Sequence, residues 1–225
     1  MPSWPAPFAA HAPAADPASR GAVRIGVGGP VGSGKTRLIE RLLPLFREAG
    51  LRVAVITNDL VTTEDAERVQ ASGLIDPALV VGVETGACPH TAIREDPSAN
   101  LDAAQQLELT HGPLDAIVIE SGGDNLAATF TNELVDWWIY VIDTAAGDDI
   151  PRKGGLGMLR ADLLLVNKID LAPHVGADLE RMRSDVARAR PDRPSLFTDL
   201  REGEGVEDVF AAIRHGALLD HAPSS

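Results

Sequence analysis

The 225-residue sequence predicts a single α/β domain with a mainly parallel, doubly wound β-sheet flanked by helices. Three observations lead to this prediction. Short apolar segments alternate along the chain with longer amphipathic segments, which is typical of strands joined by helical crossovers. Most of the short segments are continuously apolar, as strands buried on both faces are. The hydrophobic content of 44% suffices for a sizeable core, and aliphatic residues must fill most of it because aromatic residues make up only 4%.

The alternating segments give specific elements. Seven strands are expected, over Val23–Val27, Arg52–Thr57, Leu79–Val83, Ala116–Glu120, Trp138–Asp143, Asp162–Val166 and Ser195–Thr198. Five helices are expected, over Lys35–Ala49, Thr63–Ser72, Ser98–Thr110, Ala177–Arg190 and Val206–Gly216. In the first helix, apolar residues recur at spacings of three and four and share one face; they are Leu38, Leu42, Leu45 and Phe46.

Composition along the chain divides it into three parts. We expect a disordered Pro/Ala-rich extension over residues 1–20, the α/β domain over 21–220 and a short tail over 221–225. The extension has five prolines and seven alanines, without the basic region and apolar core of a signal peptide. No internal repeat or interdomain linker is evident.

Charge and cysteine content restrict the partners and the compartment. The formal net charge of −13 argues against duplex nucleic acid or an anionic membrane as the main partner. No apolar run approaches the roughly 18–20 residues that a membrane span needs. A single cysteine excludes an intrachain disulfide and favours a reducing compartment. We therefore expect a cytoplasmic protein that binds neither nucleic acid nor membranes.

A glycine-rich segment after the first expected strand has the pattern of a phosphate-binding loop. It reads Gly29-Pro30-Val31-Gly32-Ser33-Gly34-Lys35-Thr36 and matches G-x-x-x-x-G-K-[S/T] between a strand and a helix. Glycines let backbone N–H groups point at phosphate oxygens, and the helix N-terminus adds partial positive charge. We expect Lys35 to reach the β- and γ-phosphates of a nucleotide and Thr36 to bind Mg²⁺. The sequence therefore predicts a P-loop NTPase.

A second motif indicates which base the nucleotide carries. Asn167-Lys168-Ile169-Asp170 follows an expected strand, and N-K-x-D is the base-reading pattern of P-loop GTPases. The Asp170 carboxylate would accept hydrogen bonds from guanine N1–H and N2–H₂, a donor pair that adenine lacks. We expect the aliphatic part of Lys168 to cover the base and Asn167 to tie this loop to the phosphate loop. Taken alone, the segment also fits an ordinary loop with an aspartate N-cap.

Acidic residues at strand ends are candidates for Mg²⁺ binding. Glu120 and Gly123 fit the acid-x-x-Gly pattern, in which the acid holds Mg²⁺ through water and the glycine N–H meets the γ-phosphate. Asp143 lacks a glycine at that spacing, so we favour Glu120 over Asp143, which is then a turn residue. Asp59 lies where an effector loop is expected and is a candidate Mg²⁺ or γ-phosphate sensor, or else a turn residue; Glu64 is a further candidate. The expected catalytic set is Lys35, Thr36, Asp59, Glu120 and Gly123.

The only cysteine lies two residues before a histidine, in Cys88-Pro89-His90. Thiolate and imidazole are both good ligands for Ni²⁺ and Zn²⁺. One chain supplies only two such ligands, whereas a symmetric dimer would supply four by facing the same loop from each partner. Four N/S ligands allow square-planar Ni²⁺ or tetrahedral Zn²⁺. The alternative is that Cys88 is buried and inert.

Together these motifs closely resemble the urease accessory GTPases of the UreG family. The resemblance covers roughly residues 22–215, and its most specific part is the block from Cys88 to Arg94. The other matching segments are Gly26–Thr36, Thr57–Asp59, Val83–Gly86, Glu120–Asn125, Ile150–Gly155 and Asn167–Asp170.

The resemblance implies a GTPase that dimerises when GTP is bound and holds nickel at the dimer interface, at positions that match Cys88 and His90. It also implies cooperation with other urease accessory proteins, receipt of nickel from a metallochaperone and activation of apo-urease, including carboxylation of a lysine in the urease active site. The cofactors implied are GTP, Mg²⁺ and Ni²⁺, with Zn²⁺ as an alternative metal.

The chain departs from the family pattern in three places. An aromatic residue is usual near Leu60-Val61, and Gly-Gly is usual at Gly86-Ala87. Some members carry a histidine-rich N-terminus, whereas the N-terminal segment here holds only His11. A hydrogenase-maturation nickel GTPase, a P-loop small-molecule kinase and a nucleotide-binding module without turnover are the alternative functions. Asp124 stands where a switch glutamine would orient water, so we expect slow intrinsic hydrolysis of GTP to GDP and phosphate.

Overall fold

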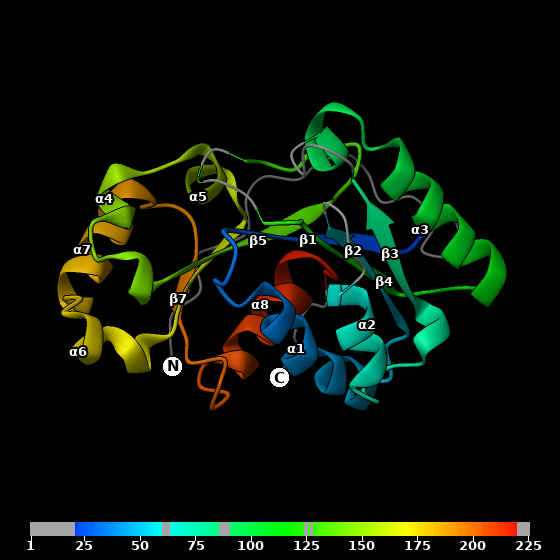
Figure 1. Ribbon diagram of the computed structural model, residues 1–225, viewed down its shortest axis with the longest axis horizontal. Coiled ribbons are helices and arrows are strands. Elements are labelled where there is room, and N and C mark those ends of the chain that lie inside the picture. Colours follow the sequence, from blue (N-terminus) through cyan, green and yellow to red (C-terminus); the bar gives the residue numbers. More distant parts are fainter. Residues whose placement is uncertain (1–20, 60–63, 86–90, 124–125, 127, 220–225) are drawn as a thin grey trace.

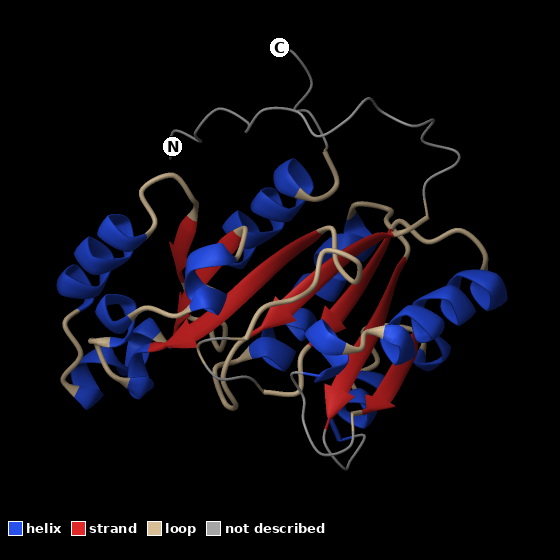
Figure 2. Cartoon of the chain, turned by 90° about the horizontal axis from the view of Figure 1, so that it is seen from above, coloured by secondary structure: helices blue, strands red, loops and turns tan. Residues whose placement is uncertain are grey.

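All seven expected strands are present, and every strand boundary lies within two residues of the expected one. The computed structural model describes residues 21–59, 64–85, 91–123, 126 and 128–219. The strands form one sheet, and every pairing between them is parallel, as the arrows in Figure 2 show. They are β1 (Val23–Gly28), β2 (Val53–Asp59), β3 (Val80–Glu84), β4 (Ala116–Glu120), β5 (Trp137–Asp143), β6 (Leu163–Asn167) and β7 (Ser195–Phe197).

The strand order places the ends of the motif-bearing strands side by side. The order is β3-β2-β4-β1-β5-β6-β7, so β1 lies between β4 and β5. In register, Val27 of β1 pairs with Glu120 of β4, and Asp143 of β5 pairs with Asn167 of β6. Because all strands are parallel, the loops that follow them emerge at one edge of the sheet.

Helices cover both faces of the sheet, as Figure 1 shows. One face packs against α1 (Lys35–Glu48), α2 (Glu64–Ala71) and α8 (Val206–Gly216). The other face packs against α3 (Ser98–His111), α5 (Leu156–Arg160) and α7 (Leu179–Ala189). The described residues thus show the expected doubly wound architecture in a single domain.

Two helix predictions need correction. Helix α7 begins at Leu179 and not at Ala177, because the Asp178 side chain caps it by accepting a hydrogen bond from Arg181 N at 3.0 Å. The described chain also contains α4 (Ile150–Lys153), α5 and α6 (Ala172–Val175), which were not expected. Each spans about one turn, which is too short to produce a helical hydrophobic period.

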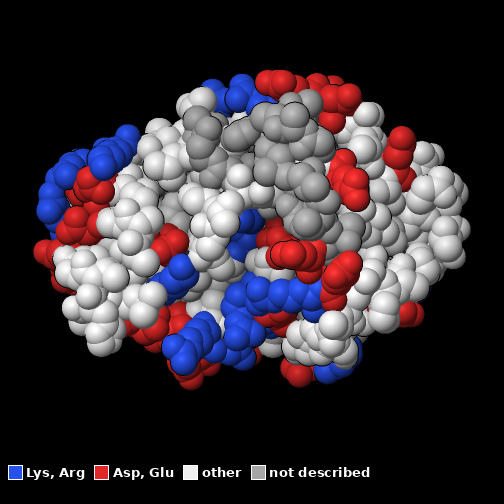
Figure 3. All heavy atoms as spheres, viewed as in Figure 1, with Lys and Arg blue, Asp and Glu red and all other residues white. Residues whose placement is uncertain are grey.

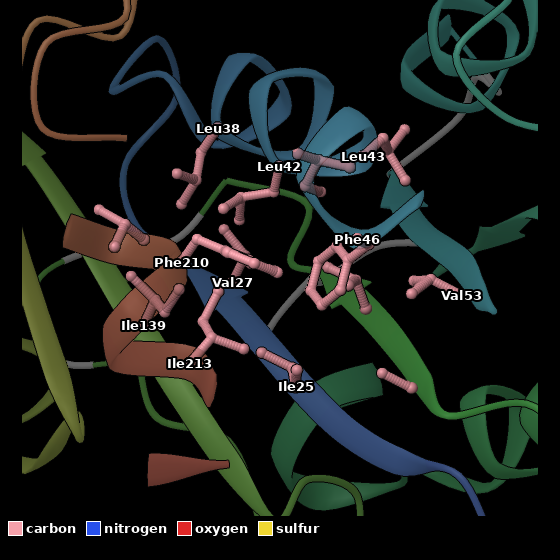
Figure 4. Close-up of a cluster of buried hydrophobic side chains, with 14 of the residues drawn as sticks. Ile25, Val27, Leu38, Leu42, Leu43, Phe46, Val53, Ile139, Phe210 and Ile213 are labelled. Carbon is pink, nitrogen blue, oxygen red and sulfur yellow. The ribbon is translucent and has the colours of Figure 1, made fainter. Parts of the chain in front are cut away.

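A large part of the core joins α1 to α8 and the central strands. Leu38, Leu42 and Phe46 of α1 are buried as expected, whereas Leu45 is only partly buried. Figure 4 shows Phe46 and Phe210 facing one another over β1 and β5. Their ring centroids are 5.2 Å apart with the rings nearly perpendicular, the edge-to-face arrangement that aromatic rings favour.

The expected extension over residues 1–20 and tail over 221–225 lie outside the described residues. In the part of the chain that is described, no helix combines the length and apolar character of a membrane span. On the face drawn in Figure 3, Lys and Arg side chains form separate groups bordered by Asp and Glu and do not merge into a continuous basic surface.

Phe46→Ala tests the packing that holds α1 in place. The side chain is 1% exposed, so its removal leaves a cavity against Phe210 and should lower the free energy of unfolding by about 3–5 kcal/mol. Leu109→Ala is the matched control, because Leu109 is 70% exposed and its truncation should cost less than about 0.5 kcal/mol. Urea denaturation of both variants measures this; equal losses would contradict the assigned core.

Candidate nucleotide and magnesium site

The phosphate loop connects β1 to α1 with its functional side chains turned inward. Ser33, Lys35 and Thr36 are buried, whereas Val31 at the tip is exposed. The Lys35 ammonium group donates to the Pro30 carbonyl oxygen at 3.2 Å, across the loop. A lysine held at the mouth of a glycine-rich turn, at the start of a helix, is the arrangement that binds nucleotide phosphates.

Two glycines of the site are required by close contacts as well as by backbone angles. Gly34 has φ of +109°, and a Cβ there would lie 2.3 Å from Asn167 Nδ2. Gly123 has φ of +91°, and a Cβ there would lie 2.4 Å from Val31 Cγ2. Any side chain at Gly34 would therefore force the base-reading loop away from the phosphate loop.

Asn167 ties the base-reading loop to the phosphate loop, as the sequence predicted. Its Nδ2 donates to Ser33 O at 2.8 Å, and its Oδ1 accepts from Leu200 N at 3.1 Å. Lys168 follows with φ of +60° and lies with its ammonium group 3.6 Å from Asp143 Oδ1. Asp170 is exposed at the same edge of the sheet, where a base could reach it.

Two carboxylates converge on the hydroxyl of Thr36. Its Oγ1 lies 2.7 Å from Glu120 Oε1 and 3.1 Å from Asp65 Oδ1, which belongs to the first turn of α2. A hydroxyl has one hydrogen, so it can donate to only one of these oxygens at a time. The other Glu120 oxygen, Oε2, is buried without a hydrogen-bond partner among the described residues. An orphaned carboxylate oxygen beside a hydroxyl and a second carboxylate suits a hard cation such as Mg²⁺.

Burial changes the ionisation of Glu120. The side chain is buried, which raises the pKa of Glu120 to about 7. The Lys35 charge acts in the opposite direction, the Asp65 charge raises the pKa further, and the Thr36 hydrogen bond lowers it. Burial and the Asp65 charge therefore favour the neutral form of the Glu120 carboxyl group.

Asp143 takes the structural role that the sequence left open for it. Its Oδ1 accepts a hydrogen bond from Ala145 N at 2.9 Å and caps the turn Thr144–Ala146. It also forms an ion pair with Lys168, so its carboxylate helps to hold the Asn167–Asp170 loop in position. The structure thus brings Glu120, and not Asp143, to the hydroxyl of Thr36.

Three expected site residues are described only in part or not at all. Asp59 ends β2 beside Glu84 of β3, but only its backbone is described. Cys88 and His90 fall within residues 86–90, which are not described. Among the described residues, no group of three or more His, Cys, Asp and Glu side chains is arranged to hold a metal ion.

Sequence reasoning missed Asp65 and weighed its neighbour Glu64 instead. The structure places Glu64 at the exposed start of α2 and turns Asp65 toward Thr36. A usable signal was the helix phase: Ala66 and Val69 are the buried residues of α2, and Asp65 borders that face.

Glu120→Gln tests the ionisation of the site through stability. The pKa of the Glu120 carboxyl group rises from its usual value of 4.5 to about 7 in the folded protein, so folding favours the neutral form. The stabilisation from the protonated Glu120 carboxyl group is fully present below pH 4.5 and is lost as the pH rises through 7. The free energy of unfolding should therefore fall by up to about 3 kcal/mol over this range. Urea denaturation of metal-free, nucleotide-free protein should show that loss in the wild type relative to Glu120→Gln. If the difference in free energy of unfolding between the wild type and Glu120→Gln stays constant from pH 5 to 8, the raised pKa of Glu120 is wrong.

Known proteins resemble this chain over most of its length. Residues 23–197 match the family model "CobW/HypB/UreG, nucleotide-binding domain". The urease accessory protein UreG of Mycolicibacterium gilvum is 68% identical over 198 residues, covering 88% of this chain and 96% of that protein.

Solved structures with the same fold include two hydrogenase maturation factors. HypB from Archaeoglobus fulgidus is 26% identical with a TM-score of 0.69, covering 86% of this chain and 89% of its own. HypB from Helicobacter pylori, solved in complex with nickel, is 21% identical with a TM-score of 0.73, covering 91% and 92%. The extent of the family match and the identity to the Mycolicibacterium protein show that the chain belongs to the CobW/HypB/UreG nucleotide-binding family and, within it, to the urease accessory proteins UreG.

Proposed function

We propose that this protein is a GTP-dependent metallochaperone of urease maturation, which binds and hydrolyses GTP and delivers nickel to apo-urease through a nucleotide-gated dimer. The observation that carries the proposal is the joining of the two nucleotide motifs by the Asn167–Ser33 hydrogen bond, beside a Thr36 hydroxyl that two carboxylates approach. Membership of the UreG family supports the urease part of the proposal.

The nucleotide would occupy the edge of the sheet between the two motifs. Backbone N–H groups of Gly29–Thr36 would surround the phosphates, and Lys35 would exchange its bond to the Pro30 carbonyl for one to the β- and γ-phosphates. Asp170 would bind the guanine edge, with Lys168 covering the base. The N–H of Gly123 would meet the γ-phosphate.

Mg²⁺ would bind beside the phosphates, where it neutralises charge that develops during phosphoryl transfer. Thr36 and Glu120 would hold the ion, Glu120 directly or through water, and Asp59 is proposed as a third residue from the effector side. We add Asp65 to this set because its carboxylate already lies 3.1 Å from the hydroxyl of Thr36. Asp124 in place of a switch glutamine supports slow intrinsic turnover.

Nickel would be the cargo and not a resident cofactor. Cys88 and His90 supply two ligands per chain, so a GTP-aligned dimer would offer four, while a monomer would offer a weak and open site. Loss of the γ-phosphate would relax the loops that carry Asp59 and Gly123 and separate the two halves of the site. The metal would then pass to apo-urease, which the other accessory proteins would hold next to the dimer.

The alternative functions are less well supported. The identity to a urease accessory protein is 68%, against 26% to a hydrogenase maturation factor. A small-molecule kinase would have no use for the base-reading motif that ends at Asp170.

Asp170→Asn tests the choice of base. The amide can donate a hydrogen bond where xanthine presents a carbonyl, so the variant should bind GTP more weakly than the wild type and should prefer xanthosine triphosphate. Calorimetric titration with GTP, ATP and xanthosine triphosphate measures this. Unchanged GTP affinity would remove Asp170 from the base-binding site.

Asp65→Asn tests the magnesium site. The amide can still accept the Thr36 hydrogen bond but lacks the charge, so the Mg²⁺ concentration needed for half-maximal GTP binding should rise by about tenfold. Asp208→Asn is the matched control, because Asp208 is an exposed carboxylate in the first turn of α8. Equal Mg²⁺ dependence in the two variants would show that Asp65 has no part in metal binding.

Cys88→Ala and His90→Ala test the shared nickel site. Either change should abolish the additional dimer that Ni²⁺ produces in the presence of a GTP analogue, while the monomer keeps its GTP affinity. Lys35→Ala should lose dimerisation with and without nickel, because it removes the phosphate contact. Gel filtration with light scattering distinguishes these cases; nickel-enhanced dimerisation in Cys88→Ala would refute the assignment.

A further inference from the structure

A buried pair of asparagine side chains links the end of β4, which carries Glu120, to the segment that follows Cys88-Pro89-His90. Asn58, at the end of β2, and Asn100, in α3, are both 0% exposed. Asn58 Nδ2 donates to Asn100 Oδ1 at 3.0 Å, and Asn100 Nδ2 donates back to Asn58 Oδ1 at 2.8 Å. The two amides therefore form a closed reciprocal ring.

Each amide also makes one outward bond, and the two bonds lead to different parts of the protein. Asn58 Nδ2 donates to the backbone carbonyl of Glu120 at 2.9 Å. Asn100 Nδ2 donates to the backbone carbonyl of Ala92 at 3.0 Å. All four amide hydrogens thus have an acceptor. Ala92 lies two residues beyond His90 in the chain, and Asn58 directly precedes Asp59.

The segment that receives the Ala92 bond is firmly held. It forms a turn of π-helix over Thr91–Glu95, and Ala92 and Ile93 are buried. The Ile93 carbonyl accepts a further hydrogen bond from Thr131 N at 3.0 Å. Because the amide ring is buried and fully bonded, a shift at Glu120 or at the end of β2 must either move Ala92 or break a buried hydrogen bond.

We propose that Asn58 and Asn100 are positioning residues that couple the occupancy of the proposed magnesium–nucleotide site to the placement of Ala92 and the turn Thr91–Glu95, which follows Cys88-Pro89-His90 in the sequence. This inference rests on the proposed function and adds to it the physical connection between nucleotide and nickel. Asn58 senses the strand ends that carry Asp59 and Glu120, and Asn100 transmits the change to Ala92. The energetic coupling works in both directions, so nickel binding should be felt at the nucleotide site through the same pair.

Hydrogen exchange of the backbone amides of Thr91–Glu95 tests the coupling in the full-length chain. In the wild type, a change from Mg-GDP to a Mg-bound non-hydrolysable GTP analogue should alter exchange at these amides. In Asn100→Ser the difference should disappear while the affinity for the analogue stays within about twofold of wild type, and the ratio of Ni²⁺ affinities with analogue and with GDP should fall toward one. Should Asn100→Ser fail to fold, Asn100→Thr, which fills nearly the volume of asparagine and likewise lacks the amide, serves as the second variant.

Gln70→Leu is the matched control. It removes another amide bond from a helix to a strand backbone, from Gln70 Nε2 to Val80 O at 3.1 Å, outside the ring. The control should keep both nucleotide-dependent differences. If Asn100→Ser melts at a lower temperature but keeps the nucleotide-dependent differences in hydrogen exchange and Ni²⁺ affinity, the Asn58–Asn100 pair is merely structural and the inference is overturned. If wild-type protein binds the analogue without altered exchange at Thr91–Glu95, the inference again fails while GTP binding stands. No binding of GTP at all would instead overturn the proposed function.

Discussion

The contact between Glu120 and Thr36 is the constraint on which the rest of the site depends. A carboxylate that is only 1% exposed, with one oxygen 2.7 Å from a hydroxyl and the other without a partner among the described residues, is costly to keep in a folded protein. A bound cation would remove that cost, and Lys35 already lowers it. This cost is tolerated because the apolar residues of α1 pack on the sheet and hold the start of the helix, with Thr36, in place.

The parallel sheet brings these groups together from distant parts of the sequence. The strands β4, β1, β5 and β6 lie next to one another, so the loops that follow them share one edge. Asn167 then fixes the distance between the phosphate loop and the base-reading loop through a single hydrogen bond to Ser33. The same edge extends through Asn58 and Asn100 to the carbonyl of Ala92, so one hydrogen-bonded framework would serve both the proposed nucleotide site and the proposed nickel site.

Sequence reasoning reached the strands, the long helices and the motif loops because each has a local signal: apolar runs, helical periodicity, or fixed glycine and lysine spacing. The link from Asn167 to the phosphate loop could also be predicted, since the motif itself implies it. The convergence of Asp65 on Thr36 and the Asn58–Asn100 ring could not be predicted, because both depend on how α2 and α3 pack on the sheet. The short helices α4, α5 and α6 were missed since one turn carries no periodicity.

An equilibrium nickel titration of the wild-type protein tests whether GTP creates a nickel site shared by two chains, as we propose. With a non-hydrolysable GTP analogue and Mg²⁺, we expect saturation at one Ni²⁺ per two chains, because Cys88 and His90 from each chain would complete a four-ligand site. With GDP, nickel binding should be weaker. Saturation at one Ni²⁺ per chain, or a nickel affinity that is the same with either nucleotide, would rule out a nucleotide-dependent site shared by two chains.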